Sequence, residues 1–230
     1  MLDFSGVEAL TIPEGNVVRI TSGETLIWEK SESFTKLTYI SVPTTAWFNT
    51  GVVPSADVKW TYEARIYCNG WGSNEYYYFA VRQTKDYSTM YAPIHVNSGF
   101  KMYLNSGKTA SAGGAKTTWY TVKSEIQDGL QNMWLDDTLK VTANQAISTK
   151  YTFPLYLFAA NFNGSMYQGT QGRISWLKIH KGDELVCDFV AAQRNADGVC
   201  GLYDRVNKEF ITNSGSGTIT AGGVATAEST

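Results

Sequence analysis

The pattern of the chain is clearest in two adjacent runs, Gly172-Arg-Ile-Ser-Trp-Leu-Lys-Ile-His180 and Glu184-Leu-Val-Cys-Asp-Phe189. In the second run Leu185, Cys187 and Phe189 fall on one face of an extended chain, and the residues between them fall on the other. A period of two is typical of a β-strand. The first run is apolar on both faces over its middle residues, which favours a strand near the centre of a sheet.

The same alternation continues outward along the chain. Thr61–Tyr67 places Tyr62, Ala64 and Ile66 on one face, and Gln131–Leu135 repeats the pattern. Dipeptides that favour tight turns separate such runs, because glycine, asparagine and aspartate tolerate positive φ. They are Asn69-Gly70, Ser98-Gly99, Ser106-Gly107, Asp128-Gly129, Asn163-Gly164 and Asp197-Gly198. No long segment has a helical period, so the sequence predicts an all-β sandwich or barrel.

The composition limits the classes of molecule that we expect this protein to bind. The 230 residues include 19 Lys+Arg and 21 Asp+Glu, a net charge of -2. This balance argues against nucleic acid or an anionic membrane as the main partner, because both attract a basic face. Aromatic residues make up 13% of the chain. Rings fill the cores of β-proteins and also stack on sugars, and composition alone does not separate the two roles.

The first residues of the chain give an expectation about where the protein is located. The start, Met1-Leu-Asp-Phe-Ser-Gly6, has no basic or apolar region of a signal peptide, and no apolar run is long enough to cross a bilayer. We therefore expect a protein made in the cytoplasm of a host cell and released within a virion at lysis.

The three cysteines are an odd number. Cys187 and Cys200 flank a predicted hairpin, and pairing and free thiols both remain open.

The sequence divides into four parts. Residues 1–30 form a strand, a turn and a strand, a leader too small to be stable alone. Residues 31–36 are expected to be a linker and residues 37–221 the sandwich. Residues 222–230 are a small polar tail, which a neighbouring subunit would hold if it were ordered.

Four segments resemble the laminin-G-like and concanavalin A-like jelly rolls of gut bacteria and their phages. They are Leu37-Thr-Tyr-Ile-Ser-Val-Pro43 with Phe48-Asn-Thr-Gly-Val-Val-Pro54, Trp119-Tyr-Thr-Val-Lys123 with Asn132-Met-Trp-Leu-Asp-Asp137, the two runs quoted first, and Asp197–Asp204 with Asn207–Phe210 and Asn213–Gly217. The resemblance covers about residues 37–221. It implies an all-β, two-sheet antiparallel jelly-roll sandwich, here with an N-terminal β-hairpin appendage.

The resemblance also implies a function. We expect a non-catalytic, virion-associated module that binds a glycan on a bacterial surface or in mucus. Ile12-Pro-Glu-Gly-Asn-Val-Val-Arg-Ile-Thr21 with Leu26-Ile-Trp28 resembles short leaders of phage structural proteins, which implies that residues 1–30 attach the module to other virion proteins. The alternative for the leader is an extra hairpin that caps the sandwich. The chain would form a homo-oligomer. One alternative is a capsid or tail decoration protein that binds no sugar. Another is a glycoside hydrolase, but the paired carboxylates of enzyme relatives, Glu-x-Asp-x-x-Glu, are absent.

Metal and cofactor chemistry has little support in the sequence. His95 and His180 are far apart and lack the spacing of a zinc site. We expect no cofactor and no metal. Calcium is the one ion left open, with Asp136, Asp137, Asn161 and Asn163 as oxygen donors.

A glycan site needs exposed rings beside polar groups. Trp71 lies between two glycines in the loop that begins at Asn69, so we expect its ring to be displayed. Trp47 is a second candidate ring. Asn161, Asn163 and Tyr167 lie in one loop and offer amides and a phenol to sugar hydroxyls. The alternative for each ring is that it folds over the sandwich edge or is buried against another subunit.

Overall fold

The computed structural model describes residues 19–22, 25–29, 34–69, 76–84, 89–96, 98–105, 107–108, 111–147 and 149–225. The chain forms two compact units, Met1–Ser33 and Phe34–Thr230. In the first, β1 (Arg19–Ser22) pairs antiparallel with β2 (Thr25–Glu29). Both strands lie within residues 1–30, the predicted leader.

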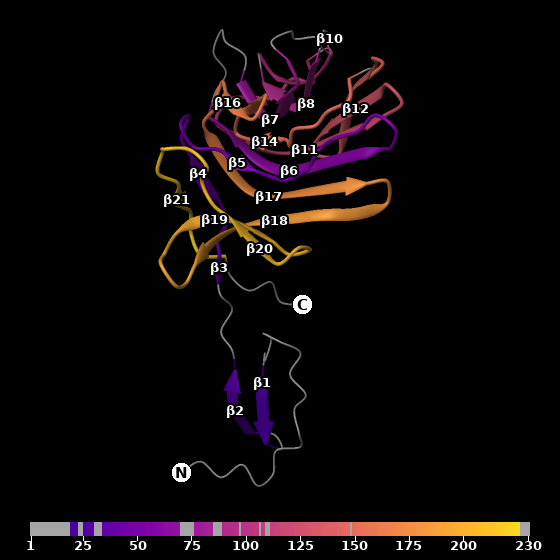
Figure 1. The fold of residues 1–230 in the computed structure, drawn as a ribbon. Coiled ribbons are helices and arrows are strands. Elements are labelled where there is room, and N and C mark those ends of the chain that lie inside the picture. Colours follow the sequence, from indigo (N-terminus) through magenta and orange to yellow (C-terminus); the bar gives the residue numbers. More distant parts are fainter. Residues whose placement is uncertain are drawn as a thin grey trace. The chain divides into compact units, whose positions relative to one another are not determined.

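The second unit contains a larger sheet of eleven strands within the described residues. Its main path runs β13-β12-β11-β6-β17-β18-β19-β20, and Figure 1 shows β6, β17 and β18 as long neighbouring ribbons. Its strands are β3 (Phe34–Lys36), β4 (Ile40–Val42), β6 (Trp60–Cys68), β11 (Thr118–Gln127), β12 (Leu130–Leu135), β13 (Thr138–Asn144), β17 (Gly172–Lys181), β18 (Glu184–Arg194), β19 (Cys200–Asp204), β20 (Glu209–Ile211) and β21 (Thr220–Ala221).

A smaller sheet of eight described strands forms the second layer (Figure 1). Its strands are β5 (Phe48–Asn49), β7 (Tyr76–Arg82), β8 (Met90–Val96), β9 (Phe100–Leu104), β10 (Gly107–Lys108), β14 (Tyr156–Leu157), β15 (Ala160–Phe162) and β16 (Ser165–Tyr167). All pairs are antiparallel except β15 with β7. No α-helix occurs among the described residues, and none of them forms a helix that could cross a membrane.

The core lies between the two sheets, where the predicted alternation places it. Tyr62, Ala64 and Ile66 of β6 are fully buried, whereas Glu63, Arg65 and Tyr67 on the other face are partly exposed. Burial of apolar side chains at this interface is the main source of stability. The predicted all-β, two-sheet antiparallel sandwich is confirmed.

The tight turns follow the predicted chemistry. Asp128-Gly129 and Asn163-Gly164 both have positive φ at each residue, 46° and 83° in the first turn and 50° and 85° in the second. Two consecutive positive φ values suit a two-residue hairpin turn, because they match the twist of the flanking strands.

The ends of the sandwich unit differ from the predicted linker and tail. Phe34–Lys36 form β3 and pair with β18. Residues 222–225 also have partners: the Thr38 N–H donates to the Gly223 carbonyl at 2.7 Å, and the Ala225 N–H donates to the Lys36 carbonyl at 3.0 Å. Residues 222–225 are therefore held by hydrogen bonds to residues 36–39 of the same chain, and their order does not require a neighbouring subunit.

Candidate functional site

The site residues that the sequence predicts fall at several places. Trp71 lies outside the described residues. Trp47 is partly exposed and stacks on Tyr156, with ring centroids 4.0 Å apart and an interplanar angle of 25°. The Tyr156 hydroxyl donates to the Gly164 carbonyl at 3.1 Å. The stack therefore joins Trp47 to the β15–β16 hairpin, and we call Trp47, Tyr156 and Asn163 the edge cluster.

Within that hairpin the three predicted polar residues have different roles. Asn161 is fully buried, donating to the Pro154 carbonyl and accepting from the Gly164 N–H, both at 2.8 Å. Its amide therefore stabilises the hairpin itself. Asn163 is exposed at the turn. The guanidinium of Arg82 lies 4.3 Å from the centroid of the Tyr167 ring, so one face of that ring is already occupied.

The candidate calcium donors do not form a cluster. One Asp136 oxygen, Oδ1, accepts hydrogen bonds from the Thr121 N–H at 2.9 Å and from Arg65 Nη1 at 3.3 Å. Asn161 is committed to the hairpin. Across the residues with assigned positions, no group of three or more His, Cys, Asp or Glu side chains could hold a metal ion.

The sequence left open whether Cys187 and Cys200 pair, and in the structure they do not. None of Cys68, Cys187 and Cys200 forms a disulfide. Burial, followed by the nearby Asp204 carboxylate, raises the pKa of Cys187 to about 12. A thiol that stays protonated is a poor nucleophile, so Cys187 serves as a small core residue.

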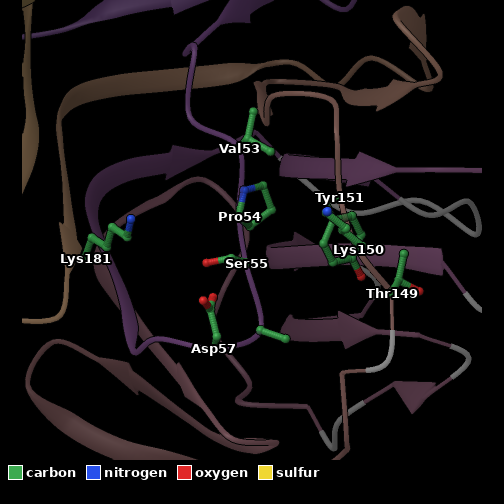
Figure 2. A pocket seen from close by; sticks show the side chains of 9 residues that line it. Val53, Pro54, Ser55, Asp57, Thr149, Lys150, Tyr151 and Lys181 are labelled. Carbon is green, nitrogen blue, oxygen red and sulfur yellow. The ribbon is translucent and has the colours of Figure 1, made fainter.

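A pocket of about 460 Å³ opens beside the segment that leads into β6 (Figure 2). Lys181 stands on one side and Thr149 and Lys150 on the other, with Ser55 and Asp57 between them. A hydrogen bond from Ser55 is the main cause that lowers the pKa of Asp57. Among the described residues that line it, the one aromatic ring, Tyr151, is 5% exposed. The pocket therefore offers polar partners but no ring on which a sugar could stack.

The outer face of the larger sheet carries exposed rings. Strand register places Trp119 opposite Tyr67, and Tyr67 opposite Arg173. Directly opposite residues in antiparallel strands share one face of the sheet. Tyr39 lies at the same end, with its ring centroid 5.6 Å from that of Trp119, and the centroid of Tyr67 is 5.5 Å from Trp119. We call Tyr39, Tyr67, Trp119 and Arg173 the ring row.

All four side chains of the ring row are partly exposed. The row continues across β4 and β21, because Arg173 pairs with Ser41 and Ser41 with Thr220. Rings, a guanidinium and two hydroxyl side chains therefore follow one another across five neighbouring strands. A flat apolar surface beside hydrogen-bonding groups is the arrangement that sugars require.

Several charges on this face are paired. Lys123 and Lys59 both contact Glu125, at 2.9 and 3.3 Å. Burial raises the pKa of Glu125, but the two lysines outweigh it and hold the pKa below its ordinary value. Such partly exposed pairs contribute little to stability. They leave the rings as the distinctive feature of the face.

A shallow depression of about 490 Å³ lies farther along the same face. Trp176 and Lys178 line it, together with the ion pair between Asp188 and Arg205. Trp176 points outward because β17 has an irregular register between Ile174 and Trp176, and such bulges redirect side chains. The outer face thus carries a further exposed ring, Trp176, in addition to the three rings of the ring row.

The ring row is not among the site residues predicted from the sequence. A signal was present, because Tyr67 and Trp119 occupy the polar faces of their strands, where a ring has no reason to fill the core. Their adjacency had no local signal. Tyr67, Trp119 and Arg173 meet only through strand pairing.

Comparisons with known proteins bear on the fold. The sequence matches no protein-family model and no curated protein. Among solved structures, a protein from Bacteroides ovatus proposed to bind carbohydrate matches 81% of this chain with 11% identity and a TM-score of 0.56. This chain covers 60% of that structure, less than two thirds of its length. The likeness supports the sandwich fold.

Two further structures have lower TM-scores. Mouse laminin α1 domains LG4-5 match 70% of this chain and 50% of their own, with 14% identity and a TM-score of 0.44. A carbohydrate-binding module from Bacillus subtilis matches 60% of this chain and 92% of its own, with 16% identity and a TM-score of 0.37.

Proposed function

We propose that this protein is a non-catalytic glycan-binding module and that the ring row holds the sugar. The observation that carries the proposal is a set of three neighbouring rings, Tyr39, Tyr67 and Trp119, on the solvent face of the larger sheet. The fold shared with a structure described as carbohydrate binding supports it.

The chemistry of the row suits a sugar. A pyranose presents an apolar C–H face and a rim of hydroxyls. Trp119 offers the largest flat surface in the row, and Arg173, Ser41 and Thr220 offer hydrogen-bonding groups beside it. Aromatic residues at the centre of a contact surface usually dominate its binding energy.

The test is a glycan array followed by affinity measurements on matched tryptophan variants. We expect Trp119→Ala to weaken glycan binding by about 1–3 kcal/mol, as loss of an exposed aromatic anchor does. Trp47→Ala is the matched control, because Trp47 is also partly exposed but lies in the edge cluster. Trp71→Ala tests the ring that the sequence singled out.

The outcomes separate the sites. A loss confined to Trp119→Ala supports the ring row. A loss confined to Trp47→Ala would move the site to the edge cluster, and one confined to Trp71→Ala to its loop. Melting temperatures of all three variants show whether any loss reflects unfolding instead.

We further propose that the module is carried on a virion as a homo-oligomer, with residues 1–30 attached to other virion proteins. The leader forms a compact unit of its own, which suits a separate attachment role. Deleting residues 1–30 is expected to leave a folded sandwich that no longer enters particles. Normal incorporation of the shortened chain would exclude the leader as the attachment point.

The competing function is a decoration protein whose sandwich only packs against other virion proteins. It predicts no binding on a broad array and no effect of Trp119→Ala on host adhesion. The absence of catalysis is a separate prediction, tested by incubating the protein with each bound polysaccharide. Release of reducing sugar that disappears when one Asp or Glu is replaced would establish a hydrolase.

A further inference from the structure

Arg173 differs from the other surface arginines of the described sandwich. Each of the others contacts a carboxylate: Arg65 with Asp136, Arg194 with Asp197, and Arg205 with Asp188. Arg173 has no such partner within the described residues. Its charge is therefore left without a carboxylate partner, unlike the charges of Lys59, Arg65 and Lys123 on the same face.

Two tyrosine rings hold the guanidinium of Arg173. Its Cζ atom lies 4.6 Å from the centroid of Tyr67 and 5.1 Å from that of Tyr39. Guanidinium groups stack readily on aromatic rings, and a guanidinium in such a contact can still donate hydrogen bonds from the N–H groups at its edge. No acceptor for these donors is found in the described part of the chain. The result is a preorganised cation with unused donors.

The ring beside it completes a composite site. Trp119 contacts both tyrosines that hold Arg173, with centroid distances of 5.5 and 5.6 Å. Arg65 lies 6.0 Å from the same Trp119 ring, and its charge is balanced by Asp136. The positive charge of this composite surface is therefore concentrated at Arg173, next to a ring on which a sugar can stack.

We propose that the ring row binds an acidic glycan, with one sugar on Trp119 and the carboxylate or sulfate group of the glycan on Arg173. This inference rests on the proposed function of the same face. A planar guanidinium fork matches two oxygens of either anion at once, which gives both affinity and orientation. Carboxylate and sulfate are alternative sources of the same oxyanion.

The row also sets the direction of the ligand. Trp119, Tyr67, Arg173, Ser41 and Thr220 occupy five neighbouring strands. Strands lie about 4.8 Å apart, so the row spans roughly 19 Å. This length accommodates several sugar rings running across the strands. An acidic oligosaccharide is therefore expected to bind more tightly than its acidic monosaccharide alone.

The experiment uses the full chain, a panel of bacterial capsular polysaccharides and mucin glycans, and two chemically altered copies of each. One copy has its carboxyl groups reduced to alcohols, and the other has its sulfate groups removed. The variants are Arg173→Gln, Trp119→Ala and the control Arg194→Gln, which removes a surface arginine that has a carboxylate partner. Thermal unfolding verifies that all three fold.

We expect every bound glycan to be acidic, and we expect its affinity to fall at least about tenfold with Arg173→Gln, the usual scale for a lost charge-assisted contact. Arg194→Gln should bind like the wild type. Loss of binding in the carboxyl-reduced copy identifies a carboxylate, and loss in the desulfated copy identifies a sulfate.

Two results would overturn the inference, and they differ in meaning. Binding that is lost with Trp119→Ala but unchanged by Arg173→Gln and by both chemical treatments leaves a neutral-glycan module, so the proposed function survives alone. Binding to no glycan in the panel removes the proposed function and this inference together.

Discussion

Tyr62 and Tyr91 face each other in the middle of the sandwich. Both side chains are fully buried, and their hydroxyl oxygens are 3.1 Å apart. Burial raises the pKa of both phenols, so they remain neutral and share one hydrogen bond. A buried hydroxyl without a partner is costly, so each tyrosine satisfies the other.

The hydrogen bond between the Tyr62 and Tyr91 hydroxyls can be tested by substitution. Tyr62→Phe should lower the free energy of unfolding by about 1–3 kcal/mol, because it leaves the Tyr91 hydroxyl without a partner. Tyr62→Phe combined with Tyr91→Phe should be closer to the wild type than the single variant, since no orphaned hydroxyl remains. Urea denaturation of the wild type, Tyr62→Phe, Tyr91→Phe and the double variant measures this. Strictly additive losses would show that the two hydroxyls do not depend on each other.

At the scale of elements, the β15–β16 hairpin shows how a short segment is held in place. Its turn has positive φ at both central residues, and the Asn161 amide links it to the Pro154 carbonyl. Tyr156 holds the turn from outside through the Gly164 carbonyl. The hairpin is thus positioned by buried side-chain hydrogen bonds in addition to its own strand pairing.

Asn161→Ala is therefore expected to destabilise the protein by about 1–3 kcal/mol, because it removes both hydrogen bonds of a fully buried amide. Asn163→Gly is the control. Asn163 is exposed and has a φ of 50°, which glycine adopts readily, so stability should change by less than about 0.5 kcal/mol. Thermal unfolding compares the two variants. Equal stability of both would mean that the buried amide contributes nothing to the hairpin.

At the scale of the sandwich unit, the two ends of its chain close the larger sheet together. β21 pairs with β4, and residues 222–225 continue this contact beside residues 36–39. Gly222 lies against Tyr39, where an added Cβ would come within 2.8 Å of the ring. The C-terminal segment therefore both completes the sheet and supports one ring of the ring row.

A chain that ends at Ala221 tests this closure. It loses the hydrogen bonds that join residues 222–225 to residues 36–39, each worth about 0.5–1.5 kcal/mol, so we expect a loss of about 2–4 kcal/mol in the free energy of unfolding. Glycan affinity should also fall, because Tyr39 loses its support. A chain that ends at Ala225 keeps these bonds and is the control. Identical melting temperatures for the two shortened chains would contradict the role of this segment.

Local sequence was sufficient for the strands and turns. The alternation of Tyr62, Ala64 and Ile66 predicted which face of β6 is buried, and Asp128-Gly129 and Asn163-Gly164 predicted hairpin turns with positive φ. These features depend on a side-chain period of two and on the steric freedom of one or two residues. Both are properties of neighbouring residues, so they can be inferred without knowing the fold.

The ring row, the role of Asn161 and the place of the tail depended on tertiary structure. Tyr67, Trp119 and Arg173 become neighbours only when β11, β6 and β17 pair in one register. The sequence predicted a surface amide at Asn161, but in the fold this side chain is buried and donates to the Pro154 carbonyl. Pattern decides which side of a strand faces the core, but strand pairing between distant segments decides which exposed residues meet, because that register is set by the packing of the whole sandwich.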